Sequence, residues 1–349
     1  MSDLAAVTTV GAAGAVSQHT GHRKPRVGFL GLGWIGRHRM EAMHASGCIE
    51  VAAIADPAIE TQEQAAAIAP EAILMGGLDD LLSADLDGIV IATPSAMHAE
   101  QAIAALERGI AVFCQKPLAR NADETRRVVD EARAADRLLL VDLSYRYVAG
   151  MDHVRDLIRS GELGDVFAAN LVFHNAYGPD KAWFYNPQLS GGGCVIDLGI
   201  HLVDLALWML DFPEVVSVRS NLYAGGKPLN GRAGIVEDYA VAGMELSNGA
   251  SVQLACSWRL QAGREAIIEA SFYGTQGGAA LRNVKGSFYD FTVERYRGTS
   301  SEVLSSPPDE WGGRAAVDWA KRLAAGELYD PSIEHIVDVA ATLDRIYGR

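Results

Sequence analysis

The chain has 349 residues, 49% of them hydrophobic and 21% charged, which is the composition of an ordinary globular protein of about two domains. Acidic residues number 44 against 30 lysines and arginines, so the formal net charge is −14, and the sequence has no basic run of the kind that binds phosphates. These numbers exclude nucleic acid and anionic membranes as expected partners.

Residues 1–24 are rich in Ala, Gly and Thr, with neither a positively charged start nor a twin-arginine pair. We expect a loosely ordered extension there rather than a signal peptide. No apolar run reaches the roughly 18 residues that cross a bilayer, so no transmembrane helix is predicted.

The cysteines lack the spacing of a metal or redox motif. They stand more than sixty positions apart, at Cys48, Cys114, Cys194 and Cys256. We interpret them as small buried residues of a protein in a reducing compartment, which predicts a cytoplasmic location and no metal site.

From Arg26 onward, short unbroken apolar runs alternate with helical patterns. The runs cover residues 26–33, 51–56, 87–93, 111–117 and 137–143. Unbroken apolar runs of this length are typical of buried parallel strands. The pattern predicts a doubly wound parallel α/β domain of the Rossmann type over residues 25–145.

The first run leads into "VGFLGLGWIGRH", a GxGxxG motif made by Gly31, Gly33 and Gly36, with Trp34 and Ile35 between them. The first glycine permits a tight turn and the second lets the backbone approach a pyrophosphate. The third permits close helix packing, and the helix N-terminus stabilises the phosphates. The motif therefore predicts dinucleotide binding.

Asp56 ends the second run, 20 residues after Gly36, where a carboxylate accepts hydrogen bonds from the adenosine ribose. It would repel a 2′-phosphate, and Pro57 rather than an arginine follows it, so we expect NAD rather than NADP. The alternative is a glycine-rich turn whose aspartate only caps a helix.

Two segments follow strands at the edge that faces the cofactor, "ATPSAMH" at 92–98 and "CQKPLAR" at 114–120. Ser95 is the expected N-cap of the next helix. For His98, packing or hydrogen bonding is a more common role than catalysis. The segments predict cofactor contacts from Thr93, Pro94, His98, Gln115 and Lys116.

After Tyr145 the pattern changes to longer strands with mixed polarity, at 166–177, 215–225, 238–258 and 265–275, with a turn at Asn248-Gly249. Helical patterns near 314–325 and 332–347 follow. We predict a second, α+β domain over residues 146–349, built on a large, mostly antiparallel open sheet.

The segment 191–208, "GGGCVIDLGIHLVDLALW", is apolar at almost every position after Gly193, which predicts a buried helix. Asp197, His201 and Asp204 interrupt it at i, i+4 and i+7, an arc of roughly 60° on a regular helix. Such a stripe either lines a cleft or forms a satisfied buried pair between two domains.

The glycine motif, "ATPSAMH", "QKP" and "GGGCVIDLGIHLVDL" resemble the Gfo/Idh/MocA oxidoreductases, which include glucose–fructose oxidoreductase and inositol dehydrogenases. The resemblance covers Arg26 to Arg349. It implies that Lys116, Asp197 and His201 surround the carbon that gives up a hydride. His201 would then be the base, Lys116 would polarise the reacting oxygen, and Asp197 would orient the imidazole or the substrate.

One position departs from that family's pattern, because Gln115 stands where a glutamate is usual. Its amide can bond to ribose or carboxamide but brings no negative charge beside Lys116. Asp204 is expected to support the helix without touching substrate. The segments "SYRY", "FHNAY" and "KAWFYNP" add candidate substrate contacts at Arg146, Tyr147, His174 and Trp183.

The resemblance implies an NAD(P)-dependent oxidoreductase that acts on a sugar, a cyclitol or a related polyol, in either direction. It also implies a homodimer or homotetramer formed through the second sheet. Two alternatives remain open: a cofactor-binding regulatory protein without turnover, and a member that uses NAD transiently to cleave glycosides.

Overall fold

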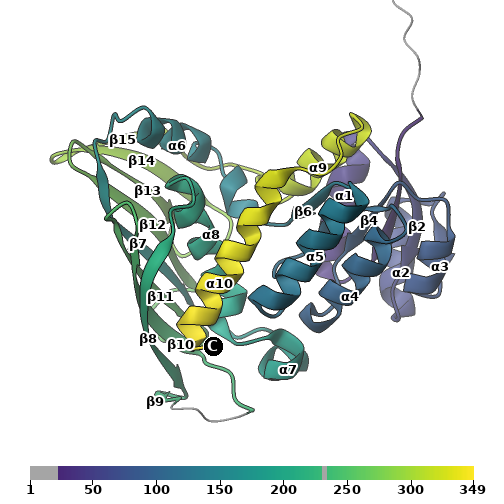
Figure 1. Cartoon of the computed structure of the whole chain (residues 1–349), viewed down its shortest axis with the longest axis horizontal. Helices are drawn as coiled ribbons and strands as arrows, with labels where there is room; N and C mark the ends of the chain where they lie inside the picture. The colour runs from purple at the N-terminus through teal and green to yellow at the C-terminus, as the bar shows by residue number, and fades with distance from the viewer. Residues whose placement is uncertain (1–22, 230–233) are drawn as a thin grey trace, which may run out of the picture.

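A computed structural model describes residues 23–229 and 234–349 and contains two β-sheets (Figure 1). The first has six parallel strands in the order β3-β2-β1-β4-β5-β6. This confirms the predicted Rossmann sheet. The strands are β1 (Arg26–Leu30), β2 (Glu50–Ala55), β3 (Ile73–Met75), β4 (Gly88–Ile91), β5 (Ala111–Cys114) and β6 (Leu139–Val141).

Alternating side chains of this sheet enter two separate cores. Phe29 and Phe113 pack with Met40 of a helix on one face, whereas Ile89 and Ile91 belong to the core on the other face. The strands are linked by α1 (Trp34–Ser46), α2 (Ile59–Ile68), α3 (Leu78–Ser83), α4 (Ser95–Leu106) and α5 (Ala122–Ala135). The strand β3, which the sequence analysis missed, is three residues long, and Ile73 and Leu74 in it are exposed.

A helix from the end of the chain completes this first unit. The helix α9 (Arg314–Ala324) packs beside α1, and the fully buried ring of Trp319 lies 6.0 Å from that of Phe113. A Cβ at Gly88 would lie 2.6 Å from the Trp319 ring, so a glycine there permits the helix to lie close on the sheet.

The second sheet has nine strands in the order β15-β14-β13-β12-β7-β11-β10-β8-β9. Only β7 and β11 pair in parallel, so the predicted mostly antiparallel sheet is confirmed. The strands are β7 (Val166–Asn175), β8 (Val215–Ala224), β9 (Lys227–Pro228), β10 (Tyr239–Leu246), β11 (Ser251–Ser257), β12 (Ala266–Gly274), β13 (Gly278–Asn283), β14 (Phe291–Arg297) and β15 (Ser300–Ser305).

Helices cover one face of this sheet and leave the other face open (Figure 1). The covering helices include α8 (Ile200–Met209) and α10 (His335–Tyr347), and α6 (Met151–Arg159) packs against α8. Because α10 also packs against α5, it joins the second sheet to the Rossmann unit. A short helix, α7 (Pro187–Ser190), precedes the apolar segment that the sequence singled out.

That apolar segment differs from the predicted regular helix. Residues Val195–Gly199 form a π-helical turn, and α8 begins only at Ile200. The stretch Pro187–Met209 is also the one helical segment among the described residues whose length and composition would suffice to span a membrane, and 89% of its apolar 18-residue window is buried inside the protein.

Candidate active site

A cavity of about 1200 Å³ lies between the glycine motif of the Rossmann unit and the polar stripe of η3 (Val195–Gly199) and α8. It is larger than the roughly 300–1000 Å³ of most small-molecule pockets, so it has room for a dinucleotide and a second ligand. Of the predicted site residues, it is lined by Gly33, Trp34, Ile35, Thr93, Pro94, His98, Gln115, Lys116, Trp183, Asp197 and His201.

The glycine motif fits a dinucleotide at each of its three positions. Gly31 has φ +88°, a conformation that other residues rarely adopt. At Gly36 a Cβ would lie 2.1 Å from the Gly31 carbonyl oxygen, so the start of α1 packs directly on the loop. At Gly33 a Cβ would meet nothing within 4 Å, and the cavity side of the backbone is open. This is the cradle that a pyrophosphate needs.

Asp56 holds the glycine motif in place and does not line the cavity. Its Oδ2 accepts a hydrogen bond from the Leu32 amide at 2.7 Å, and Oδ1 accepts one from the Ala58 amide at 2.8 Å, just before α2. The second bond is a local turn before the helix and not a cap, because Ala58 is the N-cap of α2 and no side chain caps this helix, so the capping alternative is wrong. Each oxygen keeps a second lone pair, so the ribose contact stays a prediction.

The segment after β4 corrects one prediction. Ser95 is the first residue of α4, the N-cap is Pro94, and no side chain caps this helix. His98 is buried, and its ring nitrogens lie 2.7 Å from the carbonyl oxygens of Thr93 and Pro117. Burial is the main cause that lowers its pKa. His98 therefore ties the segment after β4 to the segment that carries Lys116.

Lys116 and Asp197 meet directly in the cavity wall. The Lys116 Nζ donates to Oδ1 of Asp197 and to its main-chain oxygen, both at 2.7 Å. The Trp258 indole donates to the other carboxylate oxygen at 3.1 Å. An ammonium has three N–H groups, so one donor of Lys116 remains for a ligand. The Lys116–Pro117 peptide bond is cis.

The π-helical turn explains this double contact. In a regular α-helix the main-chain oxygen of Asp197 would accept from the amide of His201. The wider turn at Val195–Gly199 changes that pattern, and the oxygen accepts a hydrogen bond from Lys116. The predicted arc of three polar residues is therefore distorted, because Asp197 stands in the π turn while His201 and Asp204 stand in α8.

His201 presents a neutral imidazole to the cavity. Burial is the largest cause that lowers its pKa well below 6.5, and the charges of Lys116 and Arg39 lower it further. Its Nδ1 is buried without a hydrogen-bond partner among the described residues, and the Tyr145 ring packs 4.9 Å from the imidazole ring. A neutral ring at this position can accept a proton.

Three predicted substrate residues do not line the cavity. Arg146 makes a bidentate ion pair with the buried Asp204, which gives Asp204 the supporting role that was expected. The Tyr147 hydroxyl donates to Asp318 at 3.0 Å. The Nδ1 of His174 lies 2.8 Å from the Ser257 hydroxyl.

The structure adds residues that the sequence analysis did not select. The rings of Tyr145 and Trp311 lie 5.1 Å apart and, with Tyr289 and the predicted Trp183, form an aromatic wall of the cavity. Tyr145 lies inside the quoted "SYRY", but Tyr289 and Trp311 come from loops with no motif. Among the described residues, no group of three or more His, Cys, Asp or Glu could hold a metal.

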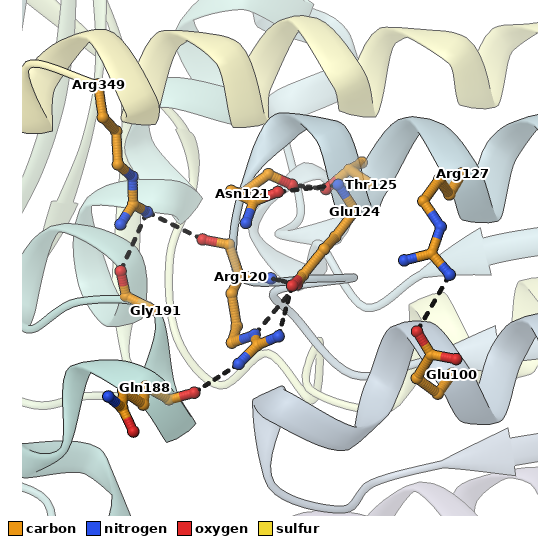
Figure 2. A network of polar contacts seen from close by, with 9 residues as sticks. All are labelled: Glu100, Arg120, Asn121, Glu124, Thr125, Arg127, Gln188, Gly191 and Arg349. Carbon is orange, nitrogen blue, oxygen red and sulfur yellow. Dashed lines mark hydrogen bonds and ion pairs between the residues drawn. The ribbon is translucent and has the colours of Figure 1, made fainter.

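A polar network behind the cavity fixes the segments that carry Lys116 and Asp197 (Figure 2). Arg120 pairs with Glu124 in the first turn of α5 and donates to the Gln188 carbonyl at 2.6 Å. Arg349 donates to the carbonyl oxygens of Arg120 and Gly191, at 2.9 and 3.0 Å. The end of α10 therefore bridges the segment after Lys116 and the segment before Asp197.

Comparisons with known proteins match both parts of the chain. An oxidoreductase family with an NAD-binding Rossmann fold matches residues 25–143, and the GFO/IDH/MocA C-terminal domain matches residues 151–280. A D-glucoside 3-dehydrogenase of Escherichia coli (strain K12) is 30% identical over 275 residues, which cover 73% of this chain and 76% of the relative.

Two further proteins extend the similarity over most of the length. Inositol 2-dehydrogenase 3 of Saccharopolyspora erythraea is 26% identical, over 90% of this chain and 85% of the relative. A levoglucosan dehydrogenase in complex with NADH and levoglucosan has a TM-score of 0.80 at 21% identity, and the match covers 93% of this chain and 96% of that one. At that identity the likeness concerns the fold.

Proposed function

The chain belongs to the GFO/IDH/MocA oxidoreductase family, and from that membership we propose that it is an NAD-dependent dehydrogenase that oxidises a secondary hydroxyl of a sugar or cyclitol. One observation carries the proposal. The Lys116 ammonium, held twice by Asp197, lies in the same cavity as the neutral imidazole of His201 and the glycine cradle.

Each of these groups has a role in the proposed reaction. His201 takes the hydroxyl proton, because its lowered pKa keeps the ring neutral and ready to accept. The third N–H of Lys116 bonds to the reacting oxygen and stabilises the negative charge that develops there. Asp197 fixes the direction of that N–H. A bound nicotinamide supplies the hydride acceptor.

The preference for NAD rests on acidic groups at the predicted ribose position. Asp56 directly follows β2, and Glu60 lies in the first turn of α2. A 2′-phosphate would be repelled by these two negative charges. The turn between them, residues 56–60, contains no arginine that could bind the phosphate.

A sugar or cyclitol substrate fits the wall opposite the glycine motif. The aromatic residues Tyr145, Trp183, Tyr289 and Trp311 offer flat apolar faces, and Asp180, Lys181 and Asp309 add polar groups along the same cavity. Rings with many hydroxyls bind through this combination. Three relatives support the same class by name: the glucoside, inositol and levoglucosan dehydrogenases described above.

The test is nicotinamide absorbance after mixing the protein with NAD or NADP and pools of aldoses, glycosides, inositols and sugar acids. Lys116→Met and His201→Gln are assayed beside the wild type, and NADH binding is measured for each by fluorescence. We expect one pool to reduce NAD and both variants to lose about 100-fold or more in kcat while they still bind NADH.

Two outcomes would contradict the proposal. If NADH binds but no pool is oxidised, a regulatory protein without turnover becomes the better reading. If aryl glycosides are cleaved without net NADH formation, the protein is instead one of the NAD-assisted glycoside-cleaving members.

A further inference from the structure

A buried ion pair forms part of the cavity wall behind Lys116. The Nε of Arg39, on α1, donates to Oδ2 of Asp142, just after β6, at 2.6 Å, and the two side chains are only 7% and 1% exposed. Both residues line the cavity. Burying two charges is costly unless further hydrogen bonds satisfy them, so the partners of this pair show what the pair holds in place.

The partners come from the segment that carries Asp142 itself and from the end of the neighbouring strand β5. The Ser144 hydroxyl donates to Oδ1 of Asp142 at 2.5 Å and accepts from Arg39 at 3.1 Å. The side-chain amide of Gln115 donates to Oδ2 of Asp142 at 2.7 Å. Gln115 and Asp142 leave neighbouring parallel strands side by side, since the Asp142 amide bonds to the Cys114 carbonyl at 2.9 Å.

This contact fixes the direction of the Gln115 amide. An ionised carboxylate only accepts hydrogen bonds, so the nitrogen of the amide must face Asp142 and the carbonyl oxygen must face away from it. That oxygen has no hydrogen-bond partner in residues 23–229 and 234–349, and Gln115 lines the cavity next to Lys116. A fixed acceptor without a partner is suited to a ligand donor.

Building on the proposed function, we propose that Asp142 is a positioning residue of the cofactor site, which turns the Gln115 carbonyl oxygen toward a donor on the nicotinamide half of NAD. The donor is an N–H of the carboxamide or a ribose hydroxyl, because these are the donors that this half carries. Asp142 itself touches no ligand and acts through Gln115.

The same pair also sets the charge next to His201. Arg39 is one of the two cations that lower the pKa of His201, and Asp142 is the carboxylate paired with Arg39. The other cation that lowers this pKa is Lys116, just after β5, which is paired with Asp197 of the π turn, and the Tyr145 ring packs against the imidazole. Loss of the Asp142 charge would leave Arg39 uncompensated beside His201.

Substitutions at positions 115 and 142 can exchange the hydrogen-bond donor and the acceptor of this contact. Gln115→Glu places two carboxylates in contact with no proton between them, so NADH affinity should fall by about tenfold or more. Adding Asp142→Asn supplies a donor at position 142, and the double variant should recover to within about threefold of wild type. NADH affinity is measured by fluorescence and the thermal midpoint by calorimetry.

Two more variants keep the test decisive if a change in the ion pair prevents folding. Gln115→Met leaves Arg39 and Asp142 paired but removes the acceptor, so NADH affinity should fall about tenfold, and the thermal midpoint should drop slightly because Asp142 also loses one hydrogen bond. The control is Glu100→Gln, which removes a carboxylate from an exposed pair with Arg127 outside the cavity (Figure 2) and should leave NADH affinity unchanged.

The pH profile of kcat/KM separates positioning from a merely structural role. With Asp142→Asn, the uncompensated Arg39 disfavours the imidazolium, so the acidic limb should move to lower pH. The inference is overturned if Gln115→Met binds NADH like the wild type, or if the double variant binds no better than Gln115→Glu. If the wild type itself does not bind NADH, the proposed function fails first and this inference fails with it.

Discussion

The imidazole of His201 lies in the cavity wall within the electrostatic reach of two cations, the Lys116 ammonium and the Arg39 guanidinium. Burial first, and these charges next, lower its pKa well below 6.5. The folded protein therefore resists protonation of this ring, whereas the unfolded chain takes up the proton near the ordinary pKa. As the pH falls below 6.5, the unfolded state binds more protons and the folded state loses stability.

We expect His201→Gln to weaken this dependence. Above pH 6.5 the ring is neutral in both the folded and the unfolded state, so its titration does not affect stability; stability is lost as the pH falls from 6.5 toward the lowered pKa of the folded state. The measurement is the urea midpoint at about pH 7.5 and about pH 5.5 for both proteins. Because the lowered pKa values of His38, His98 and His174 act in the same direction, only the difference between the two proteins isolates His201. Equal slopes would contradict the assignment.

At the level of single residues, the sequence was informative where a motif fixed the spacing. Lys116, Asp197 and His201 were selected from motifs and lie in one cavity. Arg146 and Tyr147 were selected from a short segment that has no periodic pattern, so the sequence does not show which way their side chains point. Asp204 is the reason for the difference, because a buried carboxylate needs a cationic partner and takes Arg146 away from the cavity.

At the scale of elements, the turn from β1 into α1 distinguishes two glycines that the motif treats alike. We expect Gly36→Ala to destabilise the fold by about 1–3 kcal/mol, since its Cβ would lie 2.1 Å from the Gly31 carbonyl oxygen. We expect Gly33→Ala to leave the urea midpoint unchanged, since its Cβ meets nothing within 4 Å. Its methyl group would instead occupy the cradle and weaken NADH binding by about tenfold.

Urea denaturation and NADH fluorescence on the two variants separate these effects. The reverse pattern, with a stable Gly36→Ala and a destabilised Gly33→Ala, would show that the glycine loop has another conformation. Unchanged NADH binding in Gly33→Ala would show that the dinucleotide does not bind at this loop.

Element types were largely predictable, and element details were not. The apolar runs located five of the six parallel strands, but β3 has exposed side chains and only three residues, so it leaves no apolar run to find. The π turn at Val195–Gly199 was also invisible, because one extra residue in one turn hardly changes a pattern that is apolar almost throughout.

At the scale of the whole molecule, the open face of the nine-stranded sheet is the surface through which we expect a homodimer or homotetramer. Its centre is a row of paired, exposed residues on four neighbouring strands, Arg219, Gly243, Gln253 and Asn170. The row is flat at Gly243 because glycine has no side chain, and the space above it is open, since a Cβ there would meet nothing within 4 Å. A second copy could therefore approach closely there.

Gly243→Arg tests this expectation without disturbing the protomer. The long cation would stand in open space in a single protomer but in the middle of the expected interface, so light scattering should report a monomer with an unchanged fold by circular dichroism. Glu63→Arg, on an exposed position of α2, is the control. A wild type that is monomeric, or an oligomer that survives the Gly243 change, would contradict the assignment.

The two predicted halves of the chain are also joined more closely than their sequences indicate. The boundary at 145/146 lies between β6 and β7, but α9, from the far end of the chain, packs on the Rossmann sheet with Trp319 in its core. An amphipathic pattern shows which side of a helix is apolar but not which sheet receives it. The sequence therefore could not show that α9 would pack on the Rossmann sheet.

In the polar stripe of this otherwise apolar helix, changes that raise thermal stability would lower catalytic activity. An imidazole with a buried, unpartnered nitrogen costs about 1–3 kcal/mol relative to a well-packed apolar residue. Repacking His201 with a hydrophobic side chain would therefore raise the melting temperature while it removes the base. A thermostability screen that does not measure activity would select against this histidine, so libraries built on this chain should hold it constant.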